Sequence, residues 1–177
     1  LALFGSTYLI PLFVQTALGF SATEAGLLML PAGIVLGMTF PLAGRLVDRH
    51  SARVLVVFGI GVFALSAVLF AMSDLELAFG WLVLWTVLGR VGIGFMLPAL
   101  STGALNPLEP QELGAGSSSL NFMRQLGGAF GVNLVALTIE FGEHSAGMPT
   151  INAFHSAWWL VAAFVAVAAI PVWRMRV

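Results

Sequence analysis

Six long apolar runs, separated by short polar breaks, limit what this sequence can fold into. A helix needs roughly 20 apolar residues to cross the hydrocarbon layer of a membrane, which is about 30 Å thick. Six segments meet this requirement: 1–18, 25–43, 54–72, 79–104, 113–139 and 157–173. Because backbone groups in lipid must be paired within their own helix, the pattern predicts an all-α membrane protein in which residues 1–177 form one bundle of six transmembrane helices.

Composition agrees with a protein that is surrounded mainly by lipid. Hydrophobic residues make up 59% of the chain and charged residues only 8%, whereas a soluble domain carries about 25% charged residues. The net charge of -1 argues against a nucleic-acid partner, since phosphate binding needs a basic surface. The absence of cysteine excludes disulfides and thiol catalysis within these residues.

The distribution of arginine predicts the orientation of the bundle. The break at 44–53 holds three of the seven basic residues, and short loops of this kind stay on the cytoplasmic side of a membrane. Arg174 and Arg176 then also fall inside, while the breaks that fall outside contain no arginine. We therefore expect both termini to be cytoplasmic.

Two further arginines lie inside predicted spans. Arg90 and Arg124 each fall near the middle of a segment, where a charged side chain costs at least about 2.5–3.5 kcal/mol. Both are therefore expected to face protein or a wet cavity. One interpretation is structural, with each guanidinium bonded to carbonyls of a neighbouring helix. The other, which intramembrane charge favours, is that both arginines line a substrate or ion pathway.

The fifth apolar segment carries a stripe of polar and small residues. Its members recur at spacings of three and four, which places them on one face of a helix. They are Ser117, Asn121, Arg124, Gly128 and Gly131, with Gln125 beside them. Asn and Ser alone would be explained as bonds between helices, but the central arginine favours a cavity wall.

The first segment adds one more polar candidate. Gln15 lies one turn after Pro11, and interruptions of this kind often border binding sites in transporters. The predicted substrate pathway thus consists of Gln15, Arg90, Asn121, Arg124 and Gln125.

Other side chains argue against catalysis. All eight acidic residues lie in breaks or at the ends of spans, so the spans contain no carboxylate that could carry a proton. The three histidines do not have metal-ligand spacing, and no serine is arranged with histidine and an acid. We expect no enzyme activity, no metal site and no bound cofactor.

The arginine-rich break resembles a family signature. Residues Gly44, Leu46, Asp48, Arg49 and Arg53 match the pattern G-x-L-x-D-R-x-x-x-R of the major facilitator superfamily. The stripe of the fifth segment and the Arg90-x-Gly92-x-Gly94 pattern of the fourth are similar to helices of the same family. The whole chain most resembles the C-terminal six-helix half of the fourteen-helix drug:H+ antiporters of EmrB/QacA type.

This resemblance implies a function for the complete protein. We expect a secondary transporter of the bacterial inner membrane that exports drug-like or amphipathic small molecules by alternating access, driven by a proton gradient. The substrate would bind between this half and a missing N-terminal half, which would also hold the proton-carrying carboxylate. Because Leu1 is not a start residue, the chain is interpreted as a fragment of that protein.

Two alternatives stay open. A transporter of the same superfamily could instead move a specific metabolite, such as an amino acid, a sugar or a siderophore. A protein of another class, a membrane scaffold or receptor without transport activity, could keep the same fold, although it would have little reason to bury two arginines.

The arginine-rich break is expected to act as a cytoplasmic gating loop, formed by Gly44, Arg45, Asp48, Arg49 and Arg53. An acid at position 48 precedes the third span, whose N-terminus it would stabilise by about 0.3–1 kcal/mol. The arginines could exchange partners around this acid and latch one conformation. Plain cytoplasmic anchoring by the arginines is the alternative.

Overall fold

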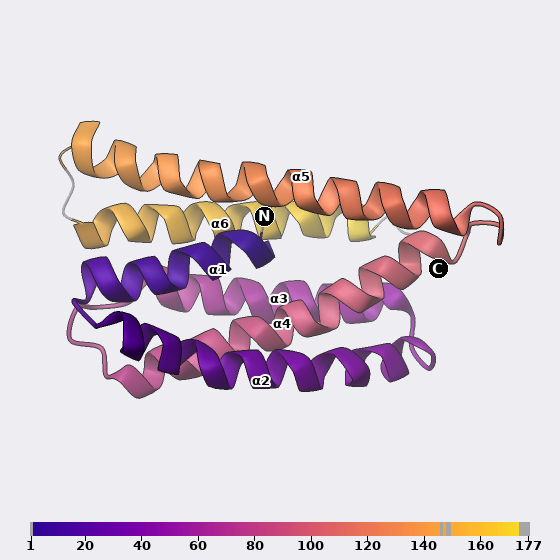
Figure 1. Ribbon diagram of the computed structural model, residues 1–177, viewed down its shortest axis with the longest axis horizontal. Coiled ribbons are helices and arrows are strands. Elements are labelled where there is room, and N and C mark those ends of the chain that lie inside the picture. Colours follow the sequence, from indigo (N-terminus) through magenta and orange to yellow (C-terminus); the bar gives the residue numbers. More distant parts are fainter. Residues whose placement is uncertain (1, 146, 148–149, 174–177) are drawn as a thin grey trace.

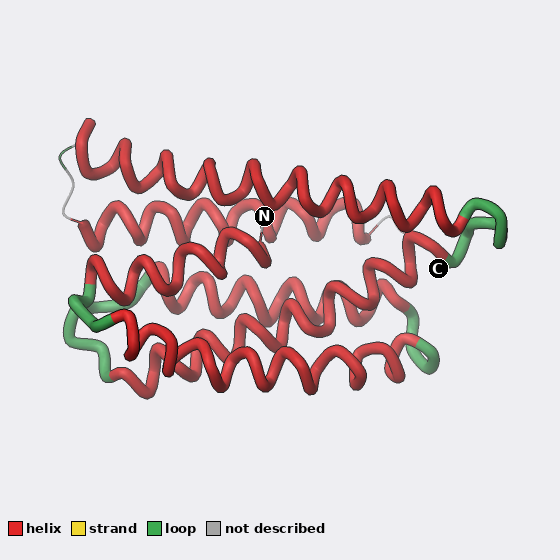
Figure 2. Tube along the Cα trace, in the orientation of Figure 1, coloured by secondary structure: helices red, strands yellow, loops and turns green. Residues whose placement is uncertain are grey.

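The computed structural model describes residues 2–145, 147 and 150–173, and every regular element among them is helical (Figures 1 and 2). The prediction of an all-α fold is therefore confirmed. The elements are α1 (Ala2–Leu12), the π-helical η1 (Phe13–Ala17), α2 (Ala22–Val47), α3 (Ala52–Ala71), α4 (Phe79–Leu105), α5 (Leu113–Glu140), the π-helical η2 (Phe141–Ser145) and α6 (Thr150–Trp173).

Five of the six predicted spans are helices long and apolar enough to cross a membrane, α2 to α6. The first differs, because its apolar helix is described over Leu3–Ala17, which is only about 22 Å long at 1.5 Å per residue. The sixth begins at Thr150 rather than at residue 157. Its additional first turns are held by Ala153 and Phe154, which are buried in the bundle.

The first helix changes its geometry after Pro11. Past this residue α1 continues as the wider η1, in which the backbone N–H of Leu18 donates to the carbonyl of Phe13, five residues back, at 3.3 Å. The next helix starts with a capping box: the Ser21 hydroxyl accepts from the Glu24 N–H, and the Glu24 carboxylate accepts from the Ser21 N–H. This box fixes the start of α2.

The closest helix packing is between α3 and α4. A Cβ added to Gly92 would lie 2.6 Å from the backbone nitrogen of Phe63 and 2.7 Å from the carbonyl oxygen of Gly59, so the two backbones touch. One turn away the Ser66 hydroxyl donates to the carbonyl of Trp85 at 2.7 Å. Small residues and a serine hydrogen bond are the usual means of holding membrane helices together.

An aromatic cluster joins four segments of the bundle. The ring of Phe70 in α3 stacks on Trp158 of α6 with centroids 4.6 Å apart, and it meets the edges of Trp85 in α4 and Phe13 in η1. Phe154 completes the cluster at 5.4 Å from Phe13. Such contacts add to the burial of large apolar surfaces and tie the π-helical end of the first helix to α3 and α6.

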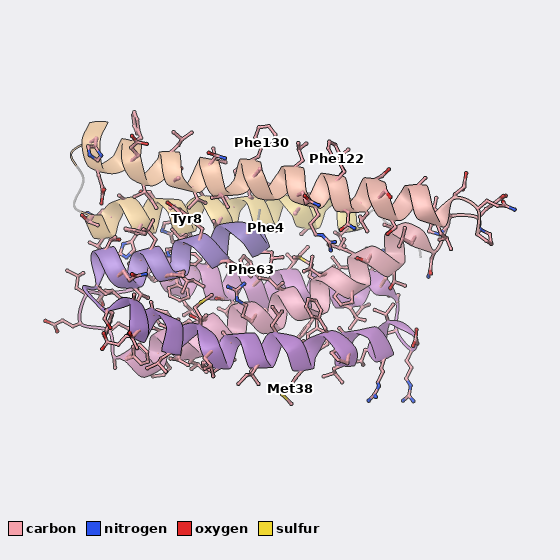
Figure 3. All side chains as sticks on the ribbon, viewed as in Figure 1. Phe4, Tyr8, Met38, Phe63, Phe122 and Phe130 are labelled. Carbon is pink, nitrogen blue, oxygen red and sulfur yellow. The ribbon has the colours of Figure 1, made fainter. Side chains whose placement is uncertain are left out.

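Helices α2 and α5 form opposite edges of the bundle (Figure 1) and make no contact with each other in the described part of the chain. Only 22% of the most apolar window of each is buried, against 50% for α3. Phe122 and Phe130 point away from the bundle on α5, as Met38 does on α2 (Figure 3). These two edges therefore present the largest unpartnered apolar surfaces.

Candidate functional site

Arg90 lies in α4 and is buried inside the bundle, with 4% of its surface exposed. Its Nη1 donates a hydrogen bond of 3.1 Å to the hydroxyl of Thr7 in α1. Its Nη2 is buried without any hydrogen-bond partner. Arg90 therefore faces protein inside the bundle, as expected. Its hydrogen bond to Thr7 joins α4 to α1.

The polar stripe of α5 divides into two parts. Gly128 and Gly131 are buried, and a Cβ on Gly128 would lie 2.6 Å from the ring of Phe4, so α1 packs directly on this glycine. One and two turns earlier, Arg124 and Asn121 are exposed. The first part of the stripe is therefore an exposed polar surface, and its second part is a contact with α1.

Arg124 has a partner within its own helix. Its Nη2 donates to the Oδ1 of Asn121, one turn earlier on α5. Gln125 is exposed beside it. Since no described hydrogen bond ties Arg124 to another helix, its guanidinium is held on the surface of α5 and not in the core.

Gln15 lies in η1 and is exposed. Its Nε2 donates to the carbonyl of Pro11 at 3.1 Å, which satisfies a backbone acceptor in the turn where the helix widens. π-Helical turns occur frequently at functional sites. Gln15 thus lies on the surface of the segment where α1 departs from regular geometry.

The five predicted pathway residues thus come from three elements: the first helix, α4 and α5. The structure joins Asn121 to Arg124 on one helix and does not bring Arg90 into contact with Arg124. Thr7 was missed by sequence reasoning. A threonine is common in apolar helices, and only the need of Arg90 for a nearby acceptor could have drawn attention to it.

The arginine-rich segment is mostly helical, not a loop. Arg45 lies in the last turn of α2 and Arg53 in the first turn of α3. Asp48 follows the end of α2 as its C-cap, and Ser51 is the N-cap of α3. Asp48 therefore adjoins the C-terminus of α2 and lies three residues before the N-cap of α3, and the expected stabilisation of the third span by this acid stays a prediction.

These residues surround an open pocket of about 390 Å³ at the end of α2. It is lined by Leu42, Arg45, Leu46, Asp48 and Arg49. Gly44 belongs to the same last turns of α2. The pocket thus places two guanidinium groups and one carboxylate next to apolar side chains, an arrangement that leaves both interpretations of this segment, latch and anchor, open.

Metal ligation has no basis among residues 2–145, 147 and 150–173, where no group of three or more histidines or acids is placed to hold an ion. Long apolar helices with a charged residue buried among them indicate a multi-pass membrane protein.

Comparison with known proteins identifies the family. The profile of the Major Facilitator Superfamily matches residues 1–177, so the chain belongs to this superfamily of transporters. Membership in a transporter family also confirms the prediction that the chain is not an enzyme.

Several bacterial proteins are similar to this chain. The lincomycin resistance protein LmrB of Listeria innocua is 35% identical over 145 residues, which cover 80% of this chain and 30% of that protein. A multidrug resistance protein B homolog of Mycobacterium tuberculosis is 32% identical, with 81% and 27% covered. An uncharacterized transporter of the superfamily from Bacillus subtilis, YcnB, is 28% identical, with 95% and 35% covered. The chain therefore spans about a third or less of the length of these relatives.

Proposed function

We propose that the complete protein is a proton-coupled exporter of drug-like, amphipathic small molecules and that this chain supplies the C-terminal half of its helical bundle. The observation that carries the proposal is the exposed polar surface of α5, where Arg124 and Asn121 lie near the middle of a membrane-length helix. A charged group at that depth needs water, substrate or a polar partner. The names of two relatives, lincomycin resistance and multidrug resistance, favour drug-like substrates.

The arrangement of the helices supports this proposal. The first helix and α4 lie between the edge helices α2 and α5 (Figure 1), and the polar candidates come from the first helix, α4 and α5. A second bundle placed against this side would cover Arg124 and Gln125 within the span of α5, while Gln15 would border the pathway from η1, close to the end of the first helix. Alternating access would then consist of rocking of one bundle against the other around that site.

The cytoplasmic ends of the helices are part of the same proposal. Arg45, Asp48 and Arg49 border one pocket, so charged partners from another bundle could be exchanged there as the protein changes conformation. Proton entry would be carried by a carboxylate outside the described residues, because those acids that are described lie in connections or close to the ends of helices.

Transport by the full-length protein in everted membrane vesicles tests the proposal. We expect vesicles energised by a proton gradient to accumulate lincomycin or an amphipathic organic cation several-fold over vesicles without the protein, and we expect a protonophore to abolish this accumulation. Amino acids and sugars are tested in the same assay as polar substrates for comparison. Transport of these alone would favour a metabolite transporter, and no transport by correctly inserted protein would favour a scaffold or receptor.

A further inference from the structure

The guanidinium of Arg90 is incompletely paired. Only 4% of the surface of Arg90 is exposed. Of its five N–H groups, the structure pairs one, which Nη1 donates to Thr7, while Nη2 is buried without a partner. Buried polar groups in proteins are almost always bonded, so an orphaned donor of this kind calls for a specific explanation.

The charge of Arg90 is also uncompensated. In the described part of the chain, neither a hydrogen bond nor an ion pair joins this guanidinium to a carboxylate. Its one partner is neutral, and the Thr7 hydroxyl already donates its own hydrogen to the carbonyl of Leu3 at 2.6 Å. Thr7 can therefore accept from the arginine but cannot donate to anything that binds beside it. Arginine keeps its charge in proteins, so the cost of burial is not relieved by loss of a proton.

The guanidinium of Arg90 lies close to an accessible surface of α1. Thr7 is exposed on α1, and its neighbours Phe4 and Tyr8 are each 39% exposed on the same side of the bundle (Figure 3). Because Arg90 donates to this exposed threonine at 3.1 Å, its guanidinium lies one hydrogen bond away from the accessible surface of α1. Arg124 differs in every respect: it is exposed, and it has a partner on its own helix.

We infer that Nη2 of Arg90 binds a carboxylate that is not among the described residues. The planar guanidinium fork matches the two oxygens of a carboxylate, and the resulting charge-assisted bonds would satisfy both the orphaned donor and the buried charge. The carboxylate has two possible sources, an acidic side chain elsewhere in the full-length protein or an anionic small molecule that enters the pathway. The second source rests on the proposed function, and the first does not.

The two sources are separated by measurements on the full-length protein in detergent. For the small-molecule source, the probe is benzoate, with neutral benzamide as its isosteric control at equal ionic strength. Benzoate is expected to raise the Tm by at least about 2 °C, benzamide to have no effect, and Arg90→Gln to remove the benzoate shift. Arg49→Gln removes an exposed arginine and is the matched control, in which the benzoate shift is retained.

For the protein source, each acid in the membrane segments of the full-length protein is changed to its amide, alone and together with Arg90→Gln. One amide variant is expected to lower the Tm in the wild-type background and to leave it unchanged in the Arg90→Gln background, because the pair is already broken. If Arg90→Gln does not assemble, Arg90→Met, which fills a similar volume and has neither charge nor N–H donors, replaces it in both experiments.

Either signal supports the inference and identifies the source. The absence of both, with no benzoate shift and no acid coupled to Arg90, would overturn it and leave Arg90 as a structural arginine. Neither measurement requires transport, so a failed vesicle assay together with a clear Arg90 signal would contradict the proposed function alone.

Discussion

Transport by an Arg124→Ala variant of the full-length protein is expected to fall to background, while the amount of inserted protein stays at the wild-type level. The side chain is exposed on α5, and its described partner is Asn121 on the same helix. Its removal therefore opens no cavity in the core. What is lost is a charged hydrogen-bond donor in the pathway, and bonds to charged groups contribute about 1.5–3 kcal/mol, which corresponds to roughly a 10- to 150-fold loss.

Asn133→Ala is the matched control for this prediction. Asn133 is also an exposed polar residue of α5, and it bonds locally to the carbonyl of Ala129. Nine residues from Arg124, at about 100° per residue, it lies on the opposite side of the helix. Its replacement is expected to leave transport near the wild-type rate in the everted-vesicle assay. Unchanged transport by the Arg124→Ala variant would remove this arginine from the pathway.

Gly92→Ala is expected to destabilise the bundle strongly. The added Cβ would lie 2.6 Å from the backbone nitrogen of Phe63 and 2.7 Å from the carbonyl of Gly59. Backbone atoms cannot turn aside as a flexible side chain does, so α3 and α4 must separate. Overpacking of this kind costs about 1–3 kcal/mol, and the loss exceeds what alanine gains as the better helix former.

Gly61→Ala provides the comparison within the same helix pair. Gly61 is exposed on α3, and a Cβ there meets nothing within 4 Å. Only the helix propensity changes, which favours alanine by up to about 1 kcal/mol. In thermal unfolding of the detergent-solubilised protein, the Gly92 variant should therefore have a lower Tm than wild type and the Gly61 variant an equal or higher one. Equal Tm values for the two variants would contradict the close packing of α3 on α4.

The course of the helices could be predicted from the sequence because long apolar runs and short breaks report directly on burial in lipid. The predicted ends of the helices were wrong where side-chain packing determines how far a helix extends. α6 begins at Thr150 because Ala153 and Phe154 are buried in the bundle. A hydropathy pattern does not show which polar residues next to an apolar run belong to the same helix. The break at 44–53 was predicted too wide for a similar reason, since α2 continues to Val47, α3 begins at Ala52, and the exact ends of both helices depend on local backbone geometry.

The candidate site could be predicted only in part. The cost of a charge in lipid applies equally to Arg90 and Arg124, so the sequence singles out both but does not distinguish them. Their difference arises from the neighbours of each helix: α4 is enclosed between other helices, whereas the first half of α5 has an open side. Thr7 and the orphaned Nη2 of Arg90 follow from three-dimensional contact between α1 and α4, and no spacing along the chain encodes that contact.

In the proposed transporter, the polar side of α5 borders an aqueous pathway. The chain contains no cysteine, so single cysteines at positions 121 and 130 can be compared after any cysteines elsewhere in the full-length protein have been replaced. Nine residues apart, these positions lie on opposite sides of the helix, and Phe130 points away from the bundle (Figure 3). The most direct measurement is the rate of labelling by a membrane-impermeant maleimide. We predict that Asn121→Cys is labelled rapidly and is protected by a transported drug, whereas Phe130→Cys is labelled slowly. Equal labelling rates at the two positions, with no protection by the drug, would contradict an aqueous pathway along this side of α5.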